Sequence, residues 1–209
     1  MKFRLTAVLV ICGFFLTILG GRGLLLYVMP AKDLYDPNVN WENLKSGQRV
    51  VCDIDFIMDP FMETYDDNGS ISSLYAMPDL VFYDGEPYVE MKHFIGVQVF
   101  AKDYPAYDAI YDNSFDVWTK GEGQLGDGGV IHFDGYLRKM KTKGRNGGKS
   151  EYDYYREYVI DDLGYTEAEM VPYIMVENKT PIANLGMFLG GVLMLAGGVV
   201  TGLLFFRKK

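Results

Sequence analysis

The hydrophobic and polar positions divide the chain into three parts. Apolar residues dominate the first 29 positions and residues 183–206, whereas polar and apolar residues alternate between them. Residues 183–206 form a stretch of 24 residues without a charge, and it ends at Arg207. A helix needs about 20 residues to cross the hydrocarbon core of a membrane. The pattern therefore predicts a transmembrane helix at 183–206, followed by a short cytoplasmic C-terminus at 207–209.

The N-terminal apolar stretch predicts another span, over residues 5–29. It follows a short basic segment at 1–4 and is interrupted by Arg22 before leucines resume. A cleavable signal peptide is the rival interpretation, but the stretch continues past Arg22 without a small-x-small cleavage site. Arg22 would lie about 25 Å along the helix axis, where a long side chain reaches the headgroups. We therefore expect an anchor here as well.

Basic residues flank the outer ends of both apolar stretches. Lys2 and Arg4 precede the first stretch, and three basic residues follow the second. Cytoplasmic flanks of membrane helices carry an excess of lysine and arginine. The sequence thus predicts a protein of the cell membrane with two cytoplasmic termini and an extracytoplasmic region at residues 31–180.

Both predicted spans carry small residues at helical spacing. Small residues let helix backbones approach closely in lipid. We therefore expect the two spans to pack as an antiparallel hairpin, or the second span to pair with another copy of the chain. The packing residues that this spacing predicts are Gly13, Thr17 and Gly20 in the first span and Gly186, Gly190, Gly197, Gly198 and Gly202 in the second.

Period-two alternation in the region between the spans predicts antiparallel strands. In residues 49–58, Val50, Cys52 and Ile54 alternate with polar positions, which is typical of a half-buried strand. Asn68-Gly69 favours a tight hairpin turn, and Asp84-Gly85 suggests another. The expected fold is α+β, with an antiparallel meander sheet. Further strands are expected at 71–77, 88–91, 94–100, 130–140 and 173–176.

Two or three helices are expected between these strands. Asp103 with Pro105 marks one helix start, and Ser150 marks a second. Thr166 and Glu169 have the spacing of a capping box, which predicts a third, short helix. The glycine-rich run 121–129 neither follows a strand nor opens a helix, so a phosphate-binding role is not favoured.

Charge is concentrated between the spans. All 28 acidic residues lie between Asp33 and Glu177, whereas only 14 of the basic residues lie in 31–180, which gives this region a net charge of −14. Such a surface repels the phosphates of nucleic acid and of anionic lipid. Solvation is the simplest role of these charges, and attraction of cations or of a basic partner is the other.

A basic tract interrupts the acidic region. It contains Arg138, Lys139, Lys141, Lys143, Arg145 and Lys149, with glycines between them. A solvated loop is the ordinary interpretation of such a tract. The functional interpretation is contact with an anionic surface, such as lipid or wall polymer, through Arg138, Lys139, Lys141, Lys143 and Arg145.

The residues that carry chemistry are few and scattered. Cys12 and Cys52 lie in different predicted environments, so we expect no disulfide and a buried, inert Cys52. His93 and His132 are the two histidines, and a zinc site would need further donors that the sequence does not single out. Nucleophile-elbow, Walker A, HExxH and Cys-x-x-Cys motifs are absent from the sequence. We therefore assign no catalytic, cofactor-binding or metal-binding residue.

The order of these features resembles a family of uncharacterised two-pass membrane proteins of Gram-positive bacteria. The resemblance rests on the first span, the Asn68-Gly69 hairpin, the strand at 94–99, a strand with Gly135, the Pro172-Tyr173-Ile174 segment and the closing span. It implies an architecture and supplies no site residues.

The leading functional hypothesis is a non-enzymatic envelope protein, whose external domain binds a partner or acts as a scaffold. The expected partners are the bilayer and another membrane or envelope protein, or a second copy of the chain, but not nucleic acid. The alternatives are an extracytoplasmic hydrolase that uses His93 or His132, and an accessory subunit of a transporter.

Overall fold

A computed structural model describes residues 2–67, 69–82, 89–178 and 181–206. The chain forms two compact units. The first contains the two chain ends, Met1–Pro30 and Asn178–Lys209, and the second is the central region Ala31–Glu177. We describe each unit by itself.

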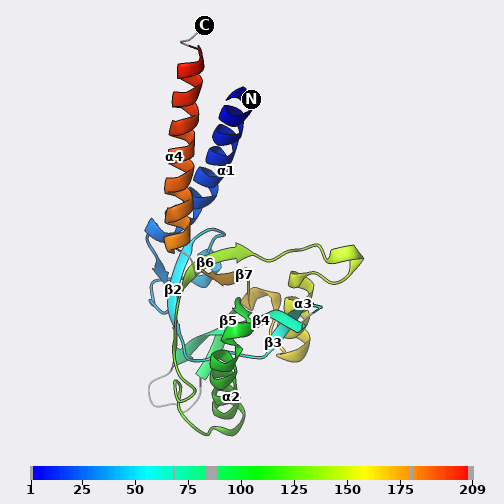
Figure 1. The fold of residues 1–209 in the computed structure, drawn as a ribbon. Coiled ribbons are helices and arrows are strands. Elements are labelled where there is room, and N and C mark those ends of the chain that lie inside the picture. The colour runs from blue at the N-terminus through cyan, green and yellow to red at the C-terminus, as the bar shows by residue number, and fades with distance from the viewer. Residues whose placement is uncertain (1, 68, 83–88, 179–180, 207–209) are drawn as a thin grey trace. The chain divides into compact units, whose positions relative to one another are not determined.

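The terminal unit consists of helices α1 (Lys2–Val28) and α4 (Pro181–Phe206), which pack against each other (Figure 1). Each helix contains a segment that is long and apolar enough to cross a membrane, Thr6–Leu26 in α1 and Ile182–Leu204 in α4. The prediction of an apolar helix at each end of the chain is confirmed. The side of the membrane on which the termini lie stays a prediction.

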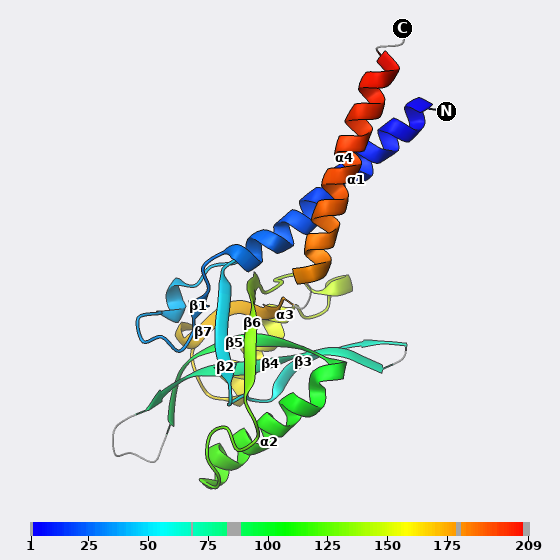
Figure 2. The ribbon, with the colours of Figure 1, turned by 60° about the vertical axis from the view of Figure 1, so that its left-hand side comes forward.

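The central unit is built on one mixed sheet of seven strands in the order β1-β2-β6-β7-β5-β4-β3 (Figure 2). The α+β class is therefore confirmed, but a simple antiparallel meander is wrong. β1 is parallel to β2, and β5 is parallel to β7. The strands are β1 (Lys32–Asp33), β2 (Arg49–Ile54), β3 (Pro60–Asp66), β4 (Gly69–Phe82), β5 (Val89–Phe100), β6 (Ile131–Lys139) and β7 (Met170–Glu177).

A meander exists only in the run β3-β4-β5, in which each strand pairs antiparallel with the next. Asp66 pairs with Gly69, as the predicted hairpin requires, while Asn68 and the predicted turn at 84–85 lie outside the described residues. After β5 the chain leaves the sheet, and β7 later enters it between β5 and β6. Alternation within a strand does not encode which distant strand becomes its neighbour, so this insertion could not be predicted.

Two helices cover the two faces of the sheet. α2 (Tyr104–Lys120) buries Tyr107 and Ile110 against one core cluster, and α3 (Glu151–Glu157) buries Tyr155 against the other. Neighbouring strand residues alternate between the clusters, because successive side chains of a strand point to opposite faces. Ile95, for example, belongs to the α2 cluster and Phe94 to the α3 cluster. Cys52 lies buried in the α2 cluster, and burial raises the pKa of its thiol.

The start of α3 and the segment after it follow local signals. Ser150 caps α3: its hydroxyl accepts the Asp153 N–H at 3.2 Å, and the Asp153 carboxylate accepts the Ser150 N–H at 2.8 Å. A π-helical turn (Tyr158–Asp162) continues α3. The predicted capping box of Thr166 and Glu169 is confirmed at a short 3-10 helix (Glu167–Glu169).

Candidate functional site

The small residues of α1 lie against α4. A Cβ added at Gly20 would come within 2.4 Å of the Phe188 main-chain nitrogen, and one added at Gly13 within 2.9 Å of the Gly191 carbonyl oxygen. Thr17 lies on the same face, and its hydroxyl donates to the Gly13 carbonyl within α1 at 2.7 Å. Only residues without a Cβ permit this approach at Gly13 and Gly20.

The face of α4 that contacts α1 differs from the one expected at Gly186, Gly190 and Gly197. A Cβ at any of these three glycines would meet nothing within 4 Å. Gly191 fills this role instead, because a Cβ there would come 2.5 Å from the Thr17 main-chain nitrogen. Gly198 and Gly202 lie on the contacting side, with a Cβ 2.7 Å from Val10 Cγ2 and 3.6 Å from Thr6 Cγ2, respectively. One step along a helix turns a side chain by about 100°, so neighbouring glycines face different ways.

The basic tract is partly neutralised by α3. Arg138 donates to Glu151 Oε2 at 2.7 Å, and the Lys141 main-chain N–H donates to the same oxygen at 2.8 Å. Burial would raise the pKa of Glu151, but the hydrogen bonds from Arg138 and Lys141 and their charges outweigh it and lower the pKa. Lys139, Lys143 and Arg145 are exposed. Lys141 and Lys149 are exposed as well, although each pairs with a carboxylate of α3, so an anionic surface would meet all of the tract except the half-buried Arg138.

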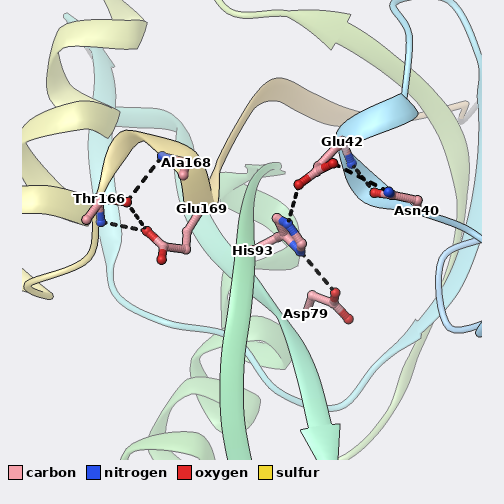
Figure 3. A network of polar contacts seen from close by, with 7 residues as sticks. All are labelled: Asn40, Glu42, Asp79, His93, Thr166, Ala168 and Glu169. Carbon is pink, nitrogen blue, oxygen red and sulfur yellow. Dashed lines mark hydrogen bonds and ion pairs between the residues drawn. The ribbon is translucent and has the colours of Figure 1, made fainter.

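His93 on β5 lies between two carboxylates (Figure 3). Its Nδ1 is 3.3 Å from Asp79 Oδ2, and its Nε2 is 3.8 Å from Glu42 Oε1. Glu169 is nearby, and its pKa is lowered mainly by hydrogen bonds from Thr166, with a smaller contribution from His93. The two pairs join the β4–β5 pair to the short 3-10 helix Trp41–Asn43, which contains Glu42.

The histidine network has the parts of a proton relay, whereas the neighbouring Thr166–Glu169 pair has a structural role. A histidine flanked by a carboxylate suits general acid–base chemistry. The Thr166 hydroxyl, which Figure 3 also shows, donates to Glu169 at 2.6 Å and belongs to the helix cap. Within the described part of the chain, no group of three His, Cys, Asp or Glu side chains is arranged to hold a metal ion.

His132 forms a separate pair. It lies directly opposite Asp53 in the β2–β6 register, and its Nδ1 is 2.7 Å from Asp53 Oδ1. Both side chains are well exposed, at 73% and 65%. The structure therefore brings each histidine to a carboxylate but does not bring the two histidines together.

Two adjoining cavities of about 380 and 370 Å³ lie between β3 and α3, and we call them the β3–α3 cleft. Pro60, Phe61 and Tyr154 line both cavities. Of the described residues that line the cleft, four carry carboxylates and none is basic. The first cavity is also lined by Asp59, Glu157, Tyr158 and Asp162, and the second by Met62 and Glu63.

Two tyrosine rings pack against Phe61, which lines the cleft. The ring of Phe61 packs 5.1 Å from that of Tyr155 and 6.4 Å from that of Tyr158, measured between centroids. Tyr158 is only 8% exposed, and among the described residues its hydroxyl is the buried side-chain polar atom without a hydrogen-bond partner. Burial and the charge of Asp59 raise the pKa of Tyr158, although the Asp59 main chain opposes this shift.

A family model described as a domain of unknown function, DUF8577, matches residues 2–206. The chain belongs to the DUF8577 family. The match includes both terminal helices and the whole central unit. No curated protein and no solved structure matches the chain.

The β3–α3 cleft and several helix-contact residues of this DUF8577 chain are not among the features that the sequence predicted. The cleft combines β3 with α3, which is about 90 residues further along the chain. Asn184 is one of these contact residues, because a Cβ at Gly23 would lie 2.2 Å from its side-chain amide nitrogen. A polar residue inside an apolar span is the signal that would have identified it, because such residues mark helix contacts in lipid.

Proposed function

We propose that this chain is a two-pass membrane protein that presents its central unit outside the cytoplasm for partner binding or envelope scaffolding, without catalysing a reaction. The observation that carries this proposal is a folded acidic unit whose sequence lies between those of two paired apolar helices. The resemblance to two-pass proteins of Gram-positive bacteria supports the same assignment.

The surface of the helix pair supports membrane insertion. Large apolar side chains along both helices are exposed, including Phe15 at 60%, Leu25 at 67% and Leu193 at 73%. A water-soluble protein rarely exposes such a continuous apolar surface, whereas lipid solvates it. The net charge of −14 on residues 31–180 makes the region between the helices suited to water and to basic partners.

Cysteine labelling of intact cells tests the topology. Lys143→Cys in the central unit should react with a membrane-impermeant maleimide, whereas Lys209→Cys should react only after lysis. The unsubstituted chain, which contains Cys12 and Cys52, gives the background. Labelling of Lys209→Cys in intact cells together with protection of Lys143→Cys would reverse the proposed orientation.

Crosslinking of native membranes followed by purification tests partner binding. We expect the chain to be recovered with at least one other envelope protein. Repeated recovery of a lone monomer would count against the proposal.

An extracytoplasmic hydrolase is the second candidate, because His93 lies beside Asp79. Hydrolysis of envelope polymer by the purified full chain, abolished by His93→Gln with the fold intact, would establish it. Equal activity of His93→Gln would reject this role for His93.

A further inference from the structure

We propose that the β3–α3 cleft binds an extended peptide segment of a partner protein that carries lysine or arginine side chains. This inference rests on the proposed partner-binding function and specifies its surface and the chemistry of its ligand. Four separate observations support it: the charge of the cleft, a lysine already seated at its rim, an unpartnered buried hydroxyl, and an open strand edge.

The charge of the cleft selects a cationic ligand. Asp59, Glu63, Glu157 and Asp162 place carboxylates around a lining that contains no basic residue among those described. Several carboxylates around one site attract a cation more strongly than a single carboxylate, because their fields add. The acidic surroundings of the central unit would also speed the approach of a basic segment.

Lys149 shows how a cation fits the rim of the cleft. Its ammonium group pairs with the Glu157 carboxylate and lies 5.6 Å from the centroid of the Tyr154 ring. An ammonium over a tyrosine face and beside a carboxylate gains both cation–π and ionic attraction. A lysine or arginine from a partner would find the same two groups, together with Asp162, which lines the same cavity.

The Tyr158 hydroxyl provides a polar group that lacks a partner. Tyr158 lines the first cavity, and its buried hydroxyl makes no hydrogen bond of ordinary geometry with a described residue, although the Asp59 main chain approaches it closely enough to oppose the rise in its pKa. Buried polar atoms of native proteins are nearly always hydrogen-bonded, so an unpaired one indicates a missing ligand or water. The main-chain groups or the cationic tip of a bound peptide would satisfy it.

The strand edge explains why the ligand should be extended. β3 ends the strand order, so within the described residues it has β4 as a strand neighbour on one side only. An exposed edge offers main-chain N–H and C=O groups to an added strand. Pro60, Phe61 and Met62 belong to β3 and line the cleft, so a peptide in the cleft runs beside this edge.

Peptide binding to the full chain in nanodiscs of zwitterionic lipid tests the proposal by fluorescence anisotropy. The probe is a labelled octapeptide of alternating threonine and lysine, and the comparison is the same peptide with glutamate for lysine. We expect binding of the lysine peptide and none of the glutamate peptide. Empty nanodiscs measure adsorption to lipid.

Matched variants locate the binding. Glu157→Gln and Asp162→Asn should each weaken binding about tenfold, the effect of losing one charge-assisted contact. Glu122→Gln removes the same charge from the exposed 121–129 loop and should leave the affinity within about twofold. An equal loss in Glu122→Gln would overturn the proposal, because it would show general attraction to the acidic unit.

Removal of Lys149 should have the opposite effect on the affinity for the lysine peptide. Lys149→Ala should strengthen binding, because it frees Glu157 and the Tyr154 ring for the probe. Lys45→Ala changes the net charge equally but lies just before β2, near the other end of the strand order, so it should have little effect. Equal gains in the two variants would reject competition by Lys149.

A main-chain N-methylated form of the lysine peptide tests strand addition. Methylation removes N–H donors, so this peptide should bind more weakly, and equal binding would overturn pairing with β3. The cleft inference fails separately from the proposed function: recovery of a partner by Glu157→Gln and Asp162→Asn chains would reject only the cleft.

Discussion

The Arg138 guanidinium donates to the Glu151 carboxylate at 2.7 Å and thereby ties the end of β6 to the first turn of α3. The Glu151 side chain is only 10% exposed, and that of Arg138 is 29% exposed. Because the Glu151 carboxylate has little contact with water, this pair couples its charge to folding.

Replacement of this carboxylate should destabilise the central unit. Glu151→Gln should lower its free energy of unfolding at neutral pH by about 3 kcal/mol, because Arg138 loses its partner. Chemical denaturation of the full chain in micelles, followed by the fluorescence of Trp41 and Trp118, measures this change. Glu122→Gln is the control and should leave the midpoint unchanged.

The Arg138–Glu151 pair also predicts that the stability of the central unit depends on pH. The pKa of Glu151 is lower in the folded chain than its ordinary value of 4.5, so the folded state favours the ionised form. The corresponding stability is present above about pH 4.5 and is lost as the pH falls through the folded pKa. Glu151→Gln should flatten this acid-dependent decline, and an unchanged decline would contradict the assignment.

The α1–α4 contact predicts that valine at Gly191 and valine at Gly190 affect the pairing of the two helices differently. Thr6→Cys with Gly202→Cys should form a disulfide in a Cys12→Ser background, since a Cβ at Gly202 lies 3.6 Å from Thr6 Cγ2. Adding Gly191→Val should suppress the disulfide, because its Cβ would collide with the Thr17 main chain.

Gly190→Val is the matched control, since a Cβ at Gly190 meets nothing within 4 Å. Gel mobility after mild oxidation measures the disulfide. Equal suppression by both valines would show that α4 presents another face to α1.

Three tyrosines with raised pKa values predict that the free energy of unfolding falls at alkaline pH. Burial raises the pKa of Tyr107 and Tyr155, and a hydrogen bond with Asp59 is the main cause that raises the pKa of Tyr111 to about 12. Their protonated forms stabilise the fold fully below about pH 10, and this stability is lost as the pH rises through the folded pKa values.

We therefore expect these phenols to ionise together with unfolding. Absorbance at the phenolate band and tryptophan fluorescence, recorded on the same samples above pH 10, should change in parallel. Complete ionisation of all tyrosines while the fluorescence stays native would contradict the burial of Tyr107 and Tyr155.

Gly135 should tolerate no side chain. A Cβ there would lie 2.2 Å from the Val176 carbonyl oxygen and 2.7 Å from the Phe133 ring, at the pairing of β6 with β7. Gly135→Ala should destabilise the central unit by about 3 kcal/mol, the upper range for overpacking. Gly148→Ala, whose Cβ would lie 3.3 Å from the Arg145 carbonyl oxygen, should cost much less in the same denaturation experiment.

Features that depend on neighbouring residues could be predicted from the sequence. The absence of charge predicts α1 and α4, and alternation in β2 places Val50, Cys52 and Ile54 in the core. The Thr166–Glu169 box forms because its two residues are only three positions apart. Such signals need no knowledge of distant contacts.

Tertiary structure decided what depends on distant neighbours. It placed β7 between β5 and β6, turned Gly191 rather than Gly190 toward α1, and joined β3 to α3 as a cleft. Hydrophobic period identifies the buried face of an element but not the element that buries it. The sequence by itself therefore determined two apolar ends and an acidic α+β region, and long-range packing decided where that region forms its cleft.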